Sequence, residues 1–316
     1  MVAETYTGGI MARVVLIHGV GRQSSCAQAE LGEWIPSLVK GVLLSRHPSA
    51  GKVGAELAAS VASAVSVVQM AFYGDLFLSD TVQGYAPTDS AETKSIAEEL
   101  AVVLLQSAAH RDEPRLKAQA RIILSQIDSN PEDTQGAGAM VRGAMARLDG
   151  DRWLAQRIFG LAQHAKPDLM QVARYLTDVD TRSQIQNRLN EQITEDTCLI
   201  IGHSLGSIVA WETCHTNKRH LPMLLTIGSP LGLDSVVYPR LRPLPPMFPP
   251  SVQRWVNVAH PDDVVAVEPR LAPLFPSEEG REVEDHNPRS AGNHHAATTY
   301  LEQAQVGYSV AEVLIP

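Results

Sequence analysis

The sequence has few of the features that mark membrane proteins, disulfide-rich proteins or nucleic-acid binders. Its apolar stretches fall short of the roughly 18 residues that a membrane span requires, so we expect no integral membrane association. Only 3 of the 316 residues are cysteines, and they lack the spacing of a disulfide framework or a metal site. The net charge of -9 argues against nucleic acid or an anionic membrane as the main partner.

The N-terminal residues also lack the pattern of a secretory signal, because no basic start is followed by an apolar stretch and a small-residue cleavage site. We therefore expect a cytoplasmic protein. With 44% hydrophobic and 19% charged residues, the composition is that of an ordinary globular protein. The length allows one large domain or two small ones with a substantial core.

Strand and helix patterns alternate at the start of the chain. Residues 14–17 are an aliphatic run that ends in His-Gly-Val-Gly, which is typical of a buried strand followed by a tight loop. An amphipathic helix is predicted over 27–45, interrupted early by Pro36, and a second strand over 65–73. This order implies a parallel pair with a crossover, and therefore an α/β protein with a mostly parallel central sheet flanked by helices.

Helical periodicity then dominates residues 78–178, without a convincing strand. The predicted helices cover residues 93–109, 114–127, 138–148, 152–164 and 167–176. A structureless loop of this length would be unusual in a compact domain. We therefore predict a helical cap of residues 78–178, inserted into an α/β core that is formed by residues 1–77 and 179–316.

The remaining elements return the chain to the sheet. We predict a helix over 182–193, strands over 198–201, 221–227, 254–258 and 281–284, a helix over 296–306 and an apolar tail over 310–315. The last of these strands is charged and is placed by its order alone. The six prolines of residues 239–250 fit neither a helix nor a ladder. We expect a loop packed over the site there, or alternatively a segment that binds proline-recognising modules.

The pattern Gly-x-Ser-x-Gly at 202–206 lies between a predicted strand and a predicted helix. This pattern has chemical meaning when a sharp strand-to-helix turn lifts the serine oxygen above the end of a sheet. The two glycines leave room for that turn, and the helix N-terminus directs amide groups toward an oxyanion formed beside the serine. Ser204 is therefore the candidate nucleophile.

A nucleophilic serine requires a base to remove its proton, an acid to orient that base, and amide donors for the oxyanion. Two adjacent carboxylates, Asp262 and Asp263, follow the strand predicted at 254–258. Two adjacent histidines, His294 and His295, precede the last predicted helix. The residues alone leave the choice within each pair open.

These segments resemble the α/β-hydrolases of the bacterial esterase and lipase type. HGVG is similar to the oxyanion loop of the family, GHSLG to its nucleophile elbow and TIGSPLG to the strand that follows. WVNVAHPDDVVA resembles the acid turn, and HAATTYL resembles a pattern in which the base histidine precedes a tyrosine. The matches cover roughly residues 13–22 and 196–300, and the predicted cap has none.

The resemblance implies a role for each matched residue. Ser204 attacks an acyl carbonyl, His295 transfers the proton and Asp263 orients His295. The amides of Val20 and Leu205 form the oxyanion hole, while Gly19 and Gly21 allow the backbone to approach closely. Tyr300 lies behind the base.

The alternatives are structural. Asp262 and His294 are the second choices for the acid and the base, while His18 and His203 are expected to brace their loops by hydrogen bonds. The histidines His260, His286, His294 and His295 could converge on zinc, but their spacing has no known ligand pattern, so we expect no metal. We expect no cofactor either.

The sequence thus predicts a serine hydrolase that cleaves a small carboxylic ester with an apolar portion, held in an apolar pocket under the cap. Thioesterase, amidase and acyltransferase activities use the same residues. An interaction protein that retains a hydrolase fold is the alternative from another class. A lipase acting at membrane surfaces is disfavoured by the negative charge and the lack of a basic amphipathic helix.

Overall fold

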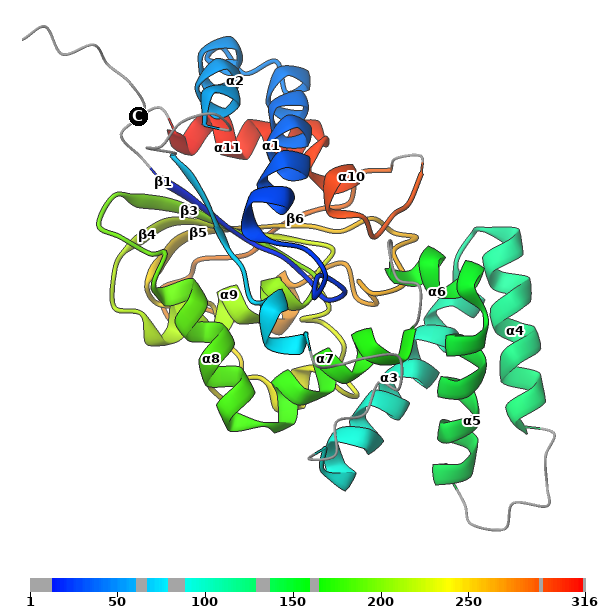
Figure 1. The fold of residues 1–316 in the computed structure, drawn as a ribbon. Helices are drawn as coiled ribbons and strands as arrows, with labels where there is room; N and C mark the ends of the chain where they lie inside the picture. Colours follow the sequence, from blue (N-terminus) through cyan, green and yellow to red (C-terminus); the bar gives the residue numbers. More distant parts are fainter. Residues whose placement is uncertain are drawn as a thin grey trace, which may run out of the picture.

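Six parallel strands form one central sheet in the computed structural model, which describes residues 13–60, 67–78, 89–128, 137–159, 165–289 and 292–314 (Figure 1). The strand order is β2-β1-β3-β4-β5-β6, and every neighbouring pair is parallel. The strands are β1 (Arg13–Ile17), β2 (Val68–Ala71), β3 (Thr197–His203), β4 (Leu221–Ile227), β5 (Val252–Val258) and β6 (Glu284–His286). The chain is therefore an α/β protein, as predicted.

Helices cover both faces of the sheet (Figure 1). On one face lie α1 (Ala27–Leu44), α2 (Ala50–Ala59), α10 (Ala297–Leu301) and α11 (Ala304–Leu314). On the other lie α8 (Val179–Asn190) and α9 (Leu205–Thr216). Within the described residues, three short 3₁₀ helices lie in the connections, at Gly74–Phe77, Tyr238–Arg240 and Ala272–Leu274. No helix in the described ranges has the length and apolar character needed to cross a bilayer.

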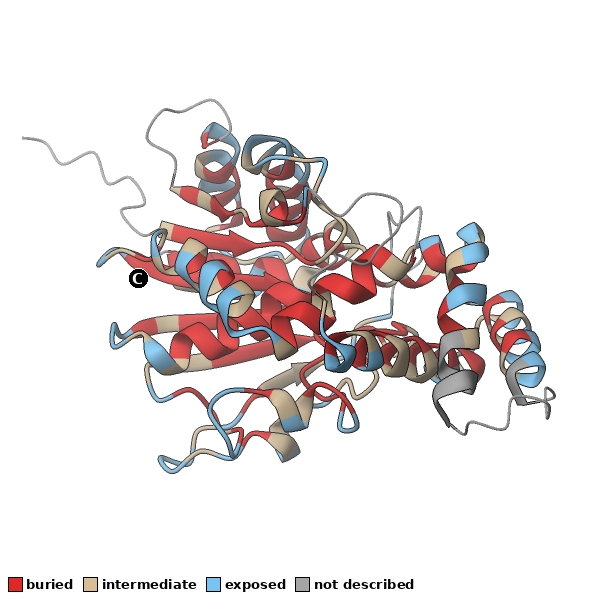
Figure 2. Cartoon of the chain, turned by 60° about the horizontal axis from the view of Figure 1, so that its bottom comes forward, coloured by how far each residue is buried: buried red, intermediate tan, exposed pale blue. Residues whose placement is uncertain are grey.

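Side chains alternate between two hydrophobic cores along each inner strand. In β1, Val14 and Leu16 pack with α1 and α11, while Val15 and Ile17 pack in the core on the α9 side. All four are fully buried, and Figure 2 shows the inner strands as a buried layer. Because both faces are covered, these strands appear in the sequence as continuous apolar runs.

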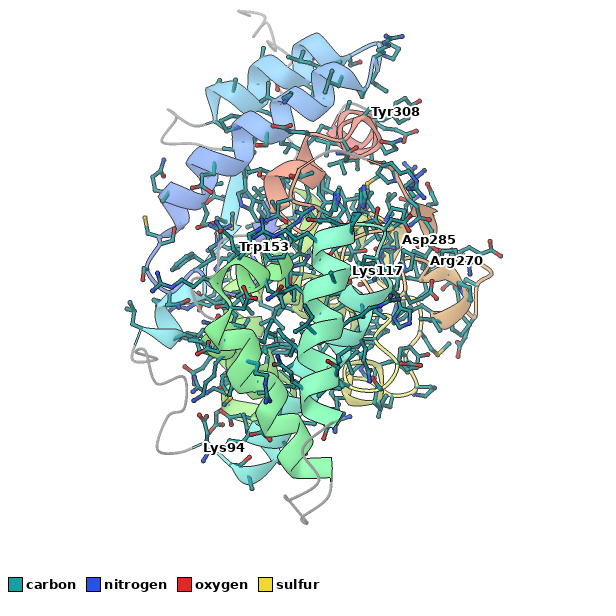
Figure 3. All side chains as sticks on the ribbon, turned by 90° about the vertical axis from the view of Figure 1, so that its right-hand side faces the viewer. Lys94, Lys117, Trp153, Arg270, Asp285 and Tyr308 are labelled. Atoms are coloured by element: carbon teal, nitrogen blue, oxygen red, sulfur yellow. The ribbon has the colours of Figure 1, made fainter. Side chains whose placement is uncertain are left out.

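The helices inserted between β2 and α8 are α3 (Ala91–His110), α4 (Pro114–Asp128), α5 (Ala137–Gly150), α6 (Arg152–Phe159) and α7 (Ala165–Thr177). They form a layer beside the sheet, in which α3 packs against α4, α5 and α7. Figure 3 looks onto this layer and labels Lys117 of α4 and Trp153 of α6. The guanidinium carbon of Arg115 lies 4.0 Å from the ring centroid of Trp153, which ties α4 to α6. The residues at 160–164, predicted to end a helix, lie outside the described residues.

Several predicted elements differ from the observed ones. Helix α2 was not predicted, although its buried residues, Ala50, Val53, Gly54 and Leu57, recur at helical spacing among many small residues. Helix α1 continues through Pro36, and β6 lies at Glu284–His286 rather than at 281–284. The predicted helix at 296–306 is two helices, and the second includes most of the predicted apolar tail. Of the strand predicted at 65–73, residues 65 and 66 lie outside the described residues.

The proline-rich loop is ordered, but its predicted place over the site is wrong. Its Met247 carbonyl accepts a hydrogen bond from the indole nitrogen of Trp211 (3.1 Å), in the second turn of α9. Phe248 packs edge-on against Trp255 of β5. None of the loop residues lines the cavity at Ser204. Proline content predicts an irregular loop, but it does not determine on which end of the sheet that loop lies.

Gly41 in α1 provides a test of the packing between helices. A Cβ atom at this position would lie 2.1 Å from the carbonyl oxygen of Leu301 in α10, whereas a Cβ at Gly32, in the same helix, would meet nothing within 4 Å. We expect Gly41→Ala to lower the free energy of unfolding by about 1–3 kcal/mol through overpacking. Gly32→Ala is the matched control and should raise it by up to about 1 kcal/mol. Urea unfolding measures both, and equal effects would contradict this packing.

Candidate active site

Ser204 lies on a sharp turn between β3 and α9. Its φ of 52° and ψ of -126° are in a region that L-residues rarely adopt. Close approach of the neighbouring chain requires glycine at 206, where a Cβ would lie 2.4 Å from the carbonyl oxygen of Ile17 and 2.5 Å from that of His18. A Cβ at Gly202 would lie 2.6 Å from the Gly206 carbonyl. The strand-to-helix context that gives the Gly-x-Ser-x-Gly pattern its meaning is therefore present.

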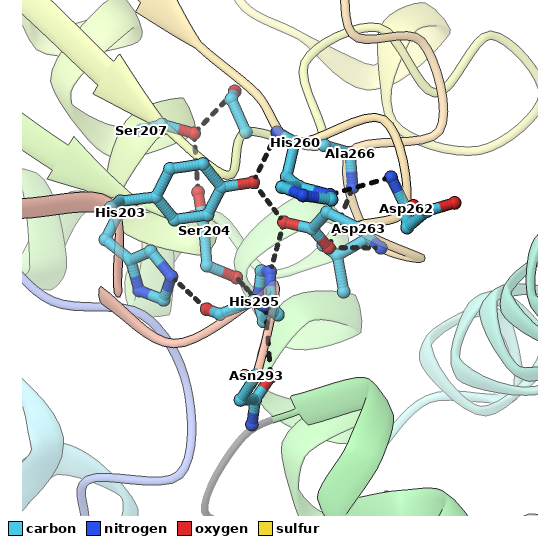
Figure 4. A network of polar contacts seen from close by, with 12 residues as sticks. His203, Ser204, Ser207, His260, Asp262, Asp263, Ala266, Asn293 and His295 are labelled. Carbon is cyan, nitrogen blue, oxygen red and sulfur yellow. Dashed lines mark hydrogen bonds and ion pairs between the residues drawn. The ribbon is translucent and has the colours of Figure 1, made fainter. Parts of the chain in front are cut away.

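Three side chains predicted from the sequence meet at this turn (Figure 4). Nε2 of His295 lies 3.1 Å from Oγ of Ser204, and Nδ1 of His295 lies 2.9 Å from Oδ2 of Asp263. Ser204, His295 and Asp263 are each at most 5% exposed. The arrangement gives the serine hydroxyl a proton acceptor, and gives that acceptor an oriented tautomer.

Asp263 is held by four donors. Oδ2 accepts a hydrogen bond from the Tyr300 hydroxyl (2.7 Å) in addition to His295, while Oδ1 accepts from the amides of Val265 (2.9 Å) and Ala266 (3.4 Å). Burial alone would raise the pKa of Asp263. The charge of His295 and these hydrogen bonds outweigh burial and lower the pKa, so the carboxyl is ionised at neutral pH.

The second-choice residues point elsewhere. Oδ1 of Asp262 accepts a hydrogen bond from the amide of Asp112, beyond the end of α3. The ring of His294 stacks on that of His260 with 3.9 Å between centroids. Neither Asp262 nor His294 contacts Ser204 in the described structure, so their contacts are those of structural residues.

The histidines considered for zinc do not form one cluster. His295 is engaged with Ser204, while His260, Asp262 and His294 form the group of described residues that could hold a metal ion, with ligand atoms within 4.8 Å of one another. Nδ1 of His260 already accepts the amide proton of Asp262. Nδ1 of His294 is buried without a hydrogen-bond partner.

His18 and His203 both brace backbone segments. Nδ1 of His18 donates to the Gly19 carbonyl (2.6 Å), and its Nε2 accepts from the amide of Tyr73 (3.1 Å). Burial lowers the pKa of His18 to about 3, against the raising effect of the Gly19 hydrogen bond. Nε2 of His203 donates to the carbonyl of His295 (2.8 Å), and burial lowers the pKa of His203 well below its usual value. Both rings are therefore neutral at pH 7.

The loop after β1 passes directly beside the serine. A Cβ at Gly19 would lie 2.8 Å from the Cβ of Ser204, and Val20 lines the same cavity as Ser204 and His295. Leu205 is the first residue of α9, where a backbone amide has no partner within the helix. Both predicted oxyanion donors thus belong to backbone next to the Ser204 oxygen.

The cavity at Ser204 has a volume of about 370 Å³. Besides the glycines and Val20, its lining consists of Arg22, Glu33, Gln156, Asp168, His203, Ser204, Asn293, His295, Ala296, Ala297 and Thr298. Most of these residues carry polar side chains, including the charged groups of Arg22, Glu33 and Asp168, which were not part of the pocket predicted from the sequence.

Two residues of α7 near the cavity were missed by sequence reasoning. Oε1 of Gln171 accepts the amide proton of Gly21 (3.2 Å), and Asp168 lines the cavity itself. No motif marks either residue, because their partners are about 150 positions away in the sequence. The sequence offers a signal only for Asp168, which is a carboxylate in the first turn of the helix predicted over 167–176.

No family model matches this chain. Neither a curated protein nor a solved structure matches it.

The lowered pKa of His18 makes folding sensitive to acid. The unfolded chain binds a proton at this residue below about pH 6.5, while the folded chain does so only near pH 3. The free energy of unfolding is therefore unaffected by protonation of His18 above about pH 6.5. Below that pH, protonation of His18 in the unfolded chain lowers it by at most about 1.4 kcal/mol per pH unit. His18→Asn should reduce the loss of unfolding free energy between pH 7 and 5 in urea titrations. The control His220→Asn, at an exposed position, should retain the wild-type slope.

Proposed function

We propose that this chain is a serine hydrolase that cleaves a carboxylic ester through an acyl-enzyme intermediate. The observation that carries the proposal is the continuous chain of contacts from Ser204 Oγ to His295 Nε2 (3.1 Å) and from His295 Nδ1 to Asp263 Oδ2 (2.9 Å). These contacts lie on a strand-to-helix turn at positive φ, which exposes the serine oxygen to substrate. The site residues and the resemblance to bacterial esterases and lipases support the same reaction.

The reaction proceeds in two halves. Oγ of Ser204 attacks the ester carbonyl while Nε2 of His295 takes the hydroxyl proton, and Asp263 stabilises the imidazolium that forms. The amides of Val20 and Leu205 stabilise the oxyanion. His295 then protonates the leaving alcohol. Water attacks the acyl-enzyme with His295 again as base, and the acid and free serine are released.

We also propose that the parallel sheet is an α/β-hydrolase core and that residues 78–178 are its cap. Supporting this, α7 from the inserted helices reaches the loop after β1 through Gln171 and Gly21. A cap at this place would limit access of water to the acyl-enzyme.

The three cysteines, Cys26, Cys198 and Cys214, are free thiols, which fits a reducing cytoplasm.

Covalent labelling tests whether Ser204 is activated. A fluorophosphonate probe should add one equivalent to the folded wild-type protein, as measured by intact mass spectrometry, and peptide mapping should place the adduct on Ser204. Activation requires the folded site, so urea-denatured protein and Ser204→Ala should not react. Absence of an adduct on folded wild type would favour the alternative of a non-catalytic interaction protein.

His294 and Asp262 provide matched controls for the proposed base, His295, and the proposed acid, Asp263. His295→Ala should lower kcat/KM for p-nitrophenyl butyrate by more than about 10³-fold, and Asp263→Asn by about 10⁴-fold, because each removes part of the proton transfer. His294→Ala and Asp262→Asn make the same changes one position away and should stay within a few-fold of wild type. Losses of equal size within either pair would contradict the assignment.

A further inference from the structure

A carboxyl group that the proposed reaction does not use lines the cavity beside Ser204. Asp168 lies in the first turn of α7 and is 3% exposed. Its two oxygens approach the loop after β1 so closely that a Cβ at Gly21 would lie 3.2 Å from each of them. The group is thus placed next to the loop that holds the proposed oxyanion donor Val20.

None of the described residues donates a hydrogen bond to this carboxyl group. One turn further along α7, Gln171 has both ends occupied, since Oε1 accepts from Gly21 and Nε2 donates to Gln23 (3.1 Å). An ionised carboxylate that is buried without hydrogen bonds is costly. The positive end of the α7 dipole offsets part of that cost, but it leaves the oxygens without donors. A ligand in the cavity would supply them.

The charges around the cavity indicate which ligands suit it. The Arg22 guanidinium is shared with Glu30 (3.3 Å) and Glu33 (3.7 Å). Burial raises the pKa of Asp168 to about 7; nearby Arg22 opposes this rise, and Asp149 adds to it. Glu33 and Asp168 both line the cavity, with Arg22 as its one lining cation among the described residues. An anionic group is therefore disfavoured there, and a hydrogen-bond donor is favoured.

We propose that Asp168 binds a hydrogen-bond donor on the substrate, a hydroxyl or a protonated amine, while the ester carbonyl is held at Ser204. This inference rests on the proposed function and deepens it. It assigns the enzyme to esters that carry a polar donor group, on either the acyl or the alcohol part. Plain aliphatic esters would leave the Asp168 oxygens unpaired in a site closed by substrate.

Isosteric ester pairs test this selectivity at pH 8, where Asp168, with a pKa of about 7, is mostly ionised. The first pair is 2-hydroxyethyl and propyl butanoate, and the second is methyl 3-hydroxybutanoate and methyl 3-methylbutanoate, which places the hydroxyl on the acyl part. The third pair is 2-(dimethylamino)ethyl and 3-methylbutyl butanoate, which tests the amine. We expect the donor-bearing ester of at least one pair to have a kcat/KM about tenfold higher or more. Equal values in all three pairs would overturn the proposal.

Substitutions of Asp168 test whether this residue causes the preference for donor-bearing esters. Asp168→Leu should abolish the preference, and Asp168→Asn should weaken it most for the amine. Both should fold, because each removes a buried carboxyl without hydrogen bonds. Asp149→Asn is the matched control, because Asp149 influences Asp168 electrostatically but does not line the cavity. A preference that survives in Asp168→Leu, or that Asp149→Asn abolishes equally, would overturn the inference.

Fluorophosphonate labelling distinguishes a failure of the Asp168 proposal from a failure of the hydrolase proposal. Wild type that labels at Ser204 but shows no donor preference would contradict the role of Asp168 and leave the hydrolase proposal intact. Wild type that neither labels nor cleaves any of the six esters would contradict both.

Discussion

The turn at Ser204 is the constraint on which the rest of the site depends. A positive φ at a residue with a side chain costs on the order of 1–3 kcal/mol, so the surrounding structure must hold it in place. Glycine at 202 and 206 allows α9 to approach β3 and the end of β1 to within backbone contact distance. The serine oxygen, the first amide of α9 and the loop after β1 are thereby fixed relative to one another.

The acid and base are held by a second set of contacts on the far side of that turn. The Tyr300 hydroxyl donates to Asp263 and accepts from the amide of His260, so α10 is tied to the loop after β5. Gly228, after β4, has a φ of 54°, and a Cβ there would lie 2.8 Å from the ring of Tyr300 and 3.1 Å from Oδ2 of Asp263. Four segments that are distant in the sequence therefore meet at buried side chains: the Ser204 turn, the chain after β4, the loop after β5, and the segment of His295 and Tyr300. Hydrogen bonds and charges have their largest effect in such buried surroundings.

The inserted helices contribute a buried carboxyl group to the cavity beside Ser204. Two carboxylates and an arginine line the cavity together with the serine and histidine, and one of the carboxylates, Asp168, comes from α7. Because Asp168 is 3% exposed, leaving this group unpaired is costly. Recognition at such a site depends on whether a ligand pairs with these groups, and less on its apolar area.

Local sequence determined the elements and the candidate residues, because strand runs, helical periodicity and the Gly-x-Ser-x-Gly turn depend on neighbours in the chain. The parallel sheet and most of the inserted helices were predicted from these signals, and the resemblance to hydrolases favoured Asp263 over Asp262 and His295 over His294. Only the tertiary structure decided what these residues contact. The charged groups at the cavity, the place of the proline-rich loop and the position of Asp168 arise from contacts between distant segments, and hydrophobic periodicity carries no information about such contacts.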